Sequence, residues 1–196
     1  IEDSAELQIH GIENLVRMEV RQADGDGVSN VTLRDLIRTS LRMRPDRIIV
    51  GEVRGEEALD MIQSMNTGHD GSLSTGHANS PQDMLSRLET MALFASDIPI
   101  QAIRKQIASS IDIIVQLERL RDRSRRVTAI AEVLDCTEDA YILNPIFEFH
   151  EQDNLVMESS SYGDIPERVV GQLERTGYHL MHRRKLHAAA LESAEI

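Results

Sequence analysis

Apolar and polar residues follow a strand rhythm in three stretches of the first 80 residues. Residues 15–21 (LVRMEVR) alternate apolar and charged side chains, and this period-two pattern predicts a half-exposed strand. Residues 47–53 (RIIVGEV) form a short continuous apolar run, which is typical of a parallel strand buried on both faces. Residues 72–78 (SLSTGHA) predict a further short strand. The early part of the chain therefore contributes several short strands to a sheet.

Helical patterns separate and follow these strands. Thr32 and Asp35 form a capping-box pattern at the start of a helix that Pro45 ends. Ser80 and Pro81 mark another helix start, with a capping hydroxyl followed by Pro at the first helical position. Further helices are expected over residues 56–65 and from about residue 99, and the first helix carries a stripe of Arg34, Arg38 and Arg42.

The alternation of strands and helices predicts an α/β fold with a mostly parallel sheet. After Arg121 the pattern changes, because residues 126–134 and 141–150 read as antiparallel strands joined by a turn. From Asp164 onward the chain reads as helical and polar. We therefore expect a main domain over residues 1–134, and an appendage of strands then helices over residues 135–196.

Composition and charge exclude several classes of protein. The chain of 196 residues has a net charge of −12 and 3% aromatic residues, so it lacks the basic and stacking surfaces of nucleic-acid-binding proteins. The single Cys136 excludes a disulfide framework and a cysteine metal site, and fits a reducing cytoplasm. No apolar run approaches the roughly 20 residues that span a bilayer. No signal peptide is visible, and the first residue is Ile, so we expect a piece of a longer protein.

Acidic residues occur where two of the expected strands end. The first residues of the chain read as the end of a strand, which Glu2 and Asp3 close, and Glu52 closes the apolar run over residues 47–53. Ligands of open parallel sheets bind beyond the carboxyl ends of the strands. A carboxylate there suits hydrated Mg²⁺, and a second carboxylate can deprotonate a water. His69 and His77 flank the next strand and could donate a hydrogen bond to a phosphate.

Each of these residues has an ordinary alternative role. An acid after an apolar run commonly marks a strand that leaves the core, and a histidine in a glycine-rich turn commonly stabilises the turn. A zinc site of His69, Asp70 and His77 is disfavoured, because neither the spacing nor a third fixed ligand matches a common motif. The residues alone therefore leave the function of this stretch open.

Three stretches together resemble the motor ATPases of type II and type IV secretion systems. They are residues 1–7 (IEDSAEL), residues 32–81 and residues 84–91 (MLSRLETM). The nearest resemblance is to the branch that serves tight-adherence (Flp) pili, and conjugal-transfer ATPases come next. The resemblance covers residues 1–134. It implies a RecA-like P-loop NTPase core, incomplete at its amino terminus, that uses ATP and Mg²⁺.

The resemblance also implies partners and a location. Such an ATPase works as a homo-oligomer, expected here to be a hexamer, with inner-membrane platform proteins. It is cytoplasmic and peripheral at the bacterial inner membrane, where ATP hydrolysis drives pilus assembly or protein export. A nucleic-acid helicase of the same broad type is disfavoured by the acidic charge and the few aromatic residues.

Candidate site residues follow by position in the family's motifs. Glu2, Asp3 and Glu6 fall in the aspartate box, with Glu2 as the first choice of water-activating base and Glu6 as its rival. Glu52 falls in the Walker B position and would hold Mg²⁺ through water. His69 and His77 fall in the histidine box. The remaining candidates, for phosphate or interface contacts, are Arg17, Arg21 and Arg54. Each of these arginines could equally be a strand-edge or surface residue.

One motif of the family is missing. Its phosphate loop reads G-x-x-x-x-G-K-S/T, and backbone N–H groups of that loop cradle the phosphates. None of the 11 glycines in this sequence is followed by Lys. We therefore expect the chain alone to hold half of a site and to be inactive. The alternative is a non-catalytic interaction or oligomerisation module.

Overall fold

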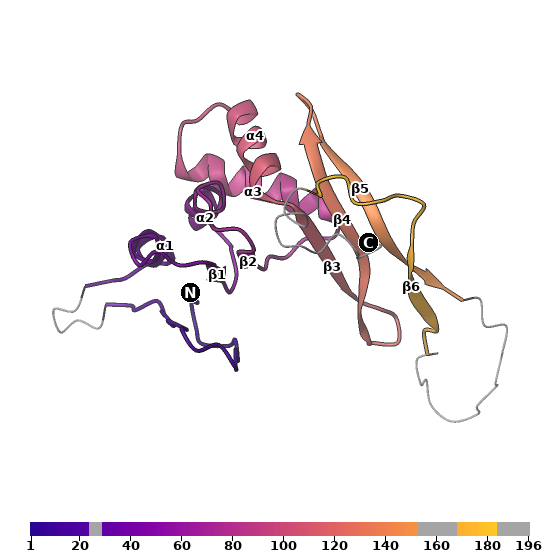
Figure 1. The fold of residues 1–196 in the computed structure, drawn as a ribbon, viewed down its shortest axis with the longest axis horizontal. Coiled ribbons are helices and arrows are strands. Elements are labelled where there is room, and N and C mark those ends of the chain that lie inside the picture. Colours follow the sequence, from indigo (N-terminus) through magenta and orange to yellow (C-terminus); the bar gives the residue numbers. More distant parts are fainter. Residues whose placement is uncertain (24–28, 153–167, 184–196) are drawn as a thin grey trace. The chain divides into compact units, whose positions relative to one another are not determined.

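The computed structural model describes residues 1–23, 29–152 and 168–183. The chain divides into two compact units, Ile1–Ile111 and Asp112–Ile196 (Figure 1). We expected a domain boundary after Leu134, but β4 (Arg125–Cys136) runs across that position inside the second unit. The assignment of residues 1–134 to an ATPase domain stays a prediction.

Local capping signals define the helices of the first unit. The Thr32 hydroxyl accepts the Asp35 N–H, and the Asp35 carboxylate accepts the Thr32 N–H, which completes the predicted capping box. Ser80 caps the third helix by accepting the Asp83 N–H. The four helices are α1 (Leu33–Leu41), α2 (Glu57–Met65), α3 (Pro81–Ala95) and α4 (Ile100–Ser110), all close to their predicted positions.

The core of the first unit is aliphatic, as the scarcity of aromatic residues requires. Helix α2 packs against α1, α3 and α4. Burying large aliphatic side chains stabilises the unit by roughly 1.5–3 kcal/mol each. The largest fully buried side chains of this core are Ile37, Met61, Ile62, Leu85, Ile103 and Ile107.

Two buried acids connect the helices through ion pairs. Asp60 of α2 accepts hydrogen bonds from Arg34 at 2.6 Å and from Arg38 at 2.8 Å, so part of the predicted arginine stripe joins α1 to α2. Arg104 of α4 binds the Glu89 carboxylate of α3 through two nitrogens, at 2.6 and 3.1 Å. Both acids are buried, so each pair fixes one helix against its neighbour.

The first unit contains a short parallel sheet. Strand β1 (Ile49–Val50) pairs in parallel with β2 (Leu73–Ser74). The amino-terminal segment lies on the other edge of β1, because the Ile1 amino group donates to the Ile49 carbonyl and the Gly51 N–H donates to the Ile1 carbonyl. Of the strand predicted over residues 15–21, the structure shows isolated bridges, including a parallel one from Glu19 to Glu2.

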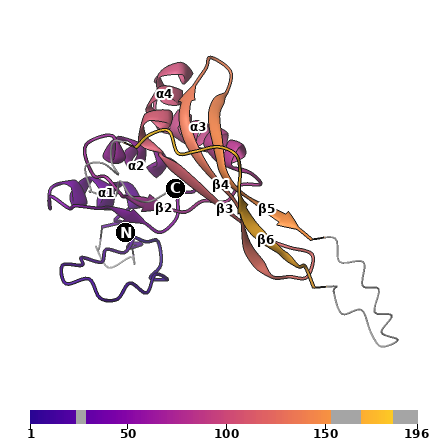
Figure 2. The same cartoon turned by 45° about the vertical axis from the view of Figure 1, so that its right-hand side comes forward.

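The second unit is an antiparallel sheet in the order β3-β4-β5-β6 (Figure 2). Strands β4 and β5 (Tyr141–Glu151) match the two predicted antiparallel strands, and β3 (Ile113–Arg119) pairs with β4. The expectation of a mostly parallel sheet is not confirmed, because four of the six named strands of the described residues pair antiparallel.

The helix predicted from Asp164 onward is wrong within residues 168–183. Strand β6 (Gly171–Arg175) occupies this region and pairs with the edge of β5. The side chains of β6 are exposed or only partly buried, which fits its polar sequence. Pairing with β5 overrides the local preference of these residues for a helix. Residues 164–167 and 184–196 of that prediction lie outside the described residues.

A buried carboxylate organises the end of the second unit. Glu132 of β4 has 1% of its surface exposed and accepts the N–H groups of Met181 at 2.9 Å and His182 at 2.7 Å. Asn144 of β5 donates to the same carboxylate at 2.9 Å. Burial acts to raise the pKa of Glu132, but these hydrogen bonds outweigh it and hold the pKa below its usual value.

Candidate functional site

Glu52 lies just beyond β1, beside the amino-terminal segment. The intervening Gly51 permits this close approach, because a Cβ atom at Gly51 would lie 3.1 Å from the Glu2 Cγ atom. Real Cβ contacts are rarely so short, so a larger residue would push the two segments apart. The predicted strand end therefore brings Glu2 and Glu52 onto neighbouring segments, as expected for acids at adjacent strand ends.

The Glu52 carboxylate has two cationic or polar neighbours. Arg54 Nη2 donates to Oε2 at 2.5 Å, and His77 Nε2 lies 3.1 Å from Oε1. The hydrogen bond from Arg54 is the main cause that lowers the pKa of Glu52. Burial opposes it, and the charges of Arg54, His77 and Arg87 add to it. Glu52 is therefore ionised at neutral pH and is held in a cationic environment.

One oxygen of the Glu52 carboxylate accepts no hydrogen bond. This atom, Oε1, is buried, and the His77 Nε2 atom lies 3.1 Å from it. Buried carboxylate oxygens without a hydrogen bond are uncommon in folded proteins. An ionised carboxylate with an unsatisfied oxygen fits a hydrated Mg²⁺, which takes one or two protein carboxylates and keeps several waters. The residues present therefore fit this metal.

Two acids of the aspartate box, Asp3 and Glu6, act electrostatically on Arg54, the partner of Glu52. The pKa of Arg54 is raised, first by its hydrogen bond to Glu52 and further by the charges of Asp3 and Glu6. Its side chain is 68% exposed, so it can move without unpacking the core. The structure thus brings Asp3, Glu6, Glu52, Arg54 and His77 into one electrostatic cluster, which we call the Glu52 cluster.

Glu2 serves the backbone of the segment that carries Glu6. Its Oε1 accepts the N–H groups of Leu7 at 2.7 Å and Glu6 at 2.8 Å, and these two hydrogen bonds lower the pKa of Glu2. Arg17 holds the same segment by donating to the carbonyls of Leu7 and Ile9, both at 2.8 Å. Glu2 and Arg17 therefore fix the loop from which the exposed Glu6 projects.

The contacts of His69 and Arg21 lie outside the Glu52 cluster. His69 Nδ1 is 3.0 Å from the Ser64 carbonyl, at the carboxyl end of α2. Arg21 exchanges backbone hydrogen bonds with Val31, and its guanidinium lies 3.4 Å from the Ser29 carbonyl. The structure gives both residues local contacts, and their predicted roles at the phosphate stay predictions.

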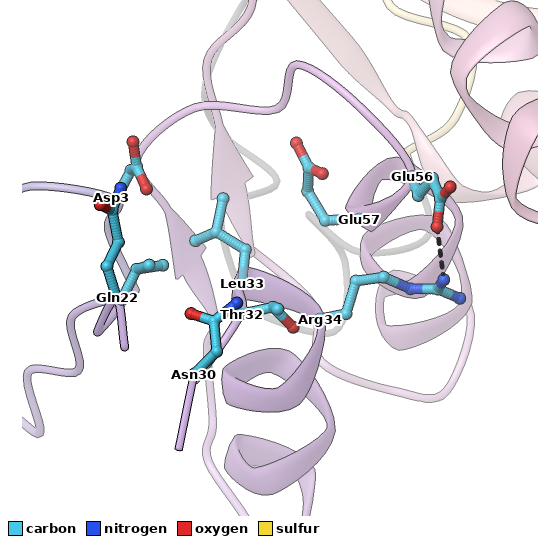
Figure 3. Close-up of a pocket in the computed structure, with 9 residues that line it drawn as sticks. Asp3, Gln22, Asn30, Thr32, Leu33, Arg34, Glu56 and Glu57 are labelled. Carbon is cyan, nitrogen blue, oxygen red and sulfur yellow. Dashed lines mark hydrogen bonds and ion pairs between the residues drawn. The ribbon is translucent and has the colours of Figure 1, made fainter. Parts of the chain in front are cut away.

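A cavity of about 400 Å³ lies next to the cluster (Figure 3). Asp3 borders it from the amino-terminal segment, and Glu57 borders it while accepting the Arg54 and Gly55 N–H groups. The sequence did not predict this cavity. The arginine stripe of α1 was one signal of it, because Arg34 belongs to that stripe and lines the cavity. The described residues that line it are Asp3, Val20, Gln22, Asn30, Thr32, Leu33, Arg34, Glu56 and Glu57.

The described residues limit the kind of metal site that Glu52 could form. Within the described ranges, no group of three or more His, Cys, Asp or Glu side chains could enclose a metal ion. A metal at Glu52 would therefore depend on water and phosphate oxygens. No helix among these residues has the length and apolar character to cross a membrane.

Comparison with known proteins identifies the family. The model of the family described as "Type II/IV secretion system protein" matches residues 1–161. The chain belongs to this family. A putative conjugal transfer protein of Mycobacterium tuberculosis is 40% identical over 131 residues, which are 67% of this chain and 37% of that protein. The type IV secretion system protein PtlH of Bordetella pertussis is 35% identical over 129 residues, 64% of this chain and 38% of that protein.

The family assignment rests on the family model, and the chain is also similar to part of a solved structure. The VirB11 ATPase from the Brucella suis type IV secretion system, in complex with sulphate, is 31% identical with a TM-score of 0.47, over 50% of this chain and 32% of that one. The expected membership of the type II/IV secretion family is confirmed. The assignment to the tight-adherence pilus branch stays a prediction. The chain spans less than two fifths of the mycobacterial and Bordetella relatives.

Proposed function

We propose that this type II/IV secretion system protein supplies the Walker B and histidine-box half of a motor ATPase site. The observation that carries the proposal is the Glu52 cluster, in which an ionised carboxylate with a free oxygen ends β1 in a chain of this family. The complete motor would have a RecA-like P-loop core. It would hydrolyse ATP with Mg²⁺ as a homo-oligomer, expected to be a hexamer.

The Glu52 carboxylate would hold Mg²⁺ through bound water. When bound, Mg²⁺ neutralises charge on the phosphates and orients them for attack by water. Arg54 occupies the other oxygen of Glu52 and is exposed. We propose that Arg54 exchanges this carboxylate for a phosphate or for a neighbouring subunit when a cation binds at Glu52.

Glu2 and Glu6 remain the two proposed water-activating bases. The hydrogen bonding favours Glu6 for this role, because the Glu2 Oε1 atom already accepts two backbone N–H groups and its lowered pKa makes it a weaker base. Glu6 is exposed and lies within the electrostatic reach of Arg54. Glu2 would then orient the loop that presents Glu6.

The remaining candidates are proposed to sense the phosphate or the subunit interface. His77 is the better placed histidine, since it contacts Glu52 while His69 contacts the end of α2. Arg17 and Arg21 carry backbone contacts in this chain and would reach a phosphate only by releasing them. Asp3 belongs to the Glu52 cluster and also lines the cavity.

The proposed cellular role is pilus assembly or protein export. The system that the motor would serve is of the tight-adherence or the conjugation type. The motor would be cytoplasmic and peripheral at the bacterial inner membrane, and would engage platform proteins there. The competing function is a non-catalytic interaction module. It is favoured by one observation, that no glycine of this sequence precedes a Lys as a phosphate loop requires.

A nucleotide titration separates the two functions. This chain alone should bind ATP very weakly, whereas a longer polypeptide that carries a phosphate loop should bind it with Mg²⁺ dependence and hydrolyse it. The measurement is a calorimetric titration of both proteins with ATP, with and without Mg²⁺, followed by phosphate release. A longer polypeptide that carries the loop but neither binds nor hydrolyses ATP would refute the motor and favour the interaction module.

A further inference from the structure

Thr75 follows β2 and holds both neighbours of Glu52. Its hydroxyl donates to the Gly51 carbonyl at 2.6 Å. Its carbonyl accepts the Val53 N–H at 3.0 Å. Because Gly51 directly precedes Glu52 and Val53 directly follows it, one residue fixes both ends of the backbone segment that carries the carboxylate.

The regular pairing of β1 and β2 stops short of Glu52. Its register joins Ile49 to Leu73 and Val50 to Ser74, and goes no further. The two hydrogen bonds of Thr75 continue the contact between the segments past this point. Hydrogen bonds of this kind contribute about 0.5–1.5 kcal/mol each, enough to select one backbone conformation among several.

The residues that follow Thr75 complete the support. A Cβ atom at Gly76 would lie 2.4 Å from the Met84 Cε atom, so the bare glycine lets Met84 of α3 lie directly against the backbone. His77 comes next and places its ring 3.1 Å from Glu52. Since the His77 side chain is 80% exposed, its position depends on this backbone anchor more than on packing of its ring.

We infer that Thr75 is a positioning residue for Glu52, and that it orients the carboxylate for its cation through Gly51 and Val53. The catalytic importance of this role rests on the proposed function, whereas the positioning itself does not. The ordinary alternative is a strand-edge threonine whose hydroxyl satisfies one carbonyl. The alternative predicts that removal of the hydroxyl leaves the backbone segment around Glu52 unchanged.

The first test uses this chain. Thr75→Val keeps the branched shape and strand preference but removes the hydroxyl, Thr75→Ser keeps the hydroxyl, and Thr90→Val removes a comparable hydroxyl that bonds the Ser86 carbonyl on α3. Amide hydrogen exchange followed by NMR should show that Thr75→Val speeds exchange of the Val53 N–H about tenfold. Thr75→Ser and Thr90→Val should match the unmodified chain.

An unchanged Val53 exchange rate in Thr75→Val, with intact amide signals from α3 and α4, would overturn the inference. If Thr75→Val loses those helix signals, Thr75→Ser decides the matter. In that case restored folding with a Val53 exchange rate equal to that of the unmodified chain supports the role of the hydroxyl, and exchange as fast as in an unfolded chain overturns it.

The second test uses a longer polypeptide that carries a phosphate loop. Thr75→Val should lower kcat about tenfold, equivalent to about 1.4 kcal/mol, with KM for ATP unchanged, and Thr75→Ser should restore kcat. Full hydrolysis by Glu52→Gln would refute the proposed function, while the NMR result would still decide the positioning. An inactive Glu52→Gln beside a fully active Thr75→Val would overturn the inference and leave the proposed function standing.

Discussion

Arg54 Nη2 lies 2.5 Å from Oε2 of Glu52, two residues earlier in the chain. This hydrogen bond is the main cause of the lowered pKa of Glu52. We predict that Arg54→Ala raises the pKa of Glu52, because the carboxylate loses both the donor and the nearest full charge. Arg54→Lys keeps the charge and should give an intermediate value.

Carbon-detected NMR titration of the Glu52 carboxyl measures this shift. Arg42→Ala, at the exposed end of α1, is the matched control and should leave the Glu52 titration unchanged. If Arg54→Ala and Arg42→Ala titrate alike, the hydrogen bond does not set the protonation of Glu52.

Asp60 should be essential to the packing of α1 on α2. Its buried carboxylate binds Arg34 and Arg38, so Asp60→Ala removes both ion pairs and should lower the free energy of unfolding by roughly 2 kcal/mol. Arg38→Ala should cost less than Arg34→Ala, because the side chain of Arg38 is 59% exposed and that of Arg34 is 28% exposed. Urea denaturation followed by circular dichroism measures all three; equal losses for the two arginines would contradict the account.

Glu132 should hold the segment that contains Met181 and His182. Glu132→Ala leaves two backbone N–H groups without their acceptor and leaves the Asn144 amide with only the His179 carbonyl, which should lower the free energy of unfolding by about 3 kcal/mol. Hydrogen exchange at Met181 and His182 should accelerate most. Glu148→Ala, an exposed acid of β5, is the control, and a similar effect of both substitutions would argue against a specific role of Glu132.

Asp122 should make the second unit sensitive to acid. The Ser124 hydroxyl and N–H are the main causes that lower the pKa of Asp122 from 3.8 to about 2, and the Val169 N–H adds to them. A carboxylate with a lowered pKa contributes its full stabilisation above the unfolded value and loses it as the pH falls through the folded value. Stability should therefore decline from about pH 4 toward pH 2.

The Val169 amide signal in NMR should follow this titration, with a midpoint near the pKa of about 2. Asp122→Asn cannot ionise and should abolish the titration at Val169. A Val169 signal that titrates in the same way in both proteins would show that another group is responsible.

Local signals in the sequence predicted the helices well, and long-range pairing was harder to predict. Thr32 with Asp35, and Ser80 with Pro81, mark helix starts within four residues, so each cap could be read directly. The polar β6 carries no strand signal of its own and forms because β5 offers an edge. Pairing partners 20 or more residues apart leave no such local signature.

The same distinction applies to the site. The carboxylate of Glu52 follows a recognisable apolar run, so its position at a strand end was predictable. The choice between His69 and His77 depended on how two turns fold, and the structure brings His77 to Glu52. The two amide hydrogen bonds to Glu2 depend on the path of the following loop, which no spacing of residues reveals.

ATP hydrolysis by Glu52→Gln tests the central claim most directly. The assay compares the unmodified protein, Glu52→Gln and the control Glu148→Gln in a longer polypeptide that carries a phosphate loop, at several Mg²⁺ concentrations. We predict that Glu52→Gln abolishes turnover with the fold intact, because the amide removes the negative charge that would hold hydrated Mg²⁺. Glu148→Gln should keep full activity. Undiminished hydrolysis by Glu52→Gln would contradict the account.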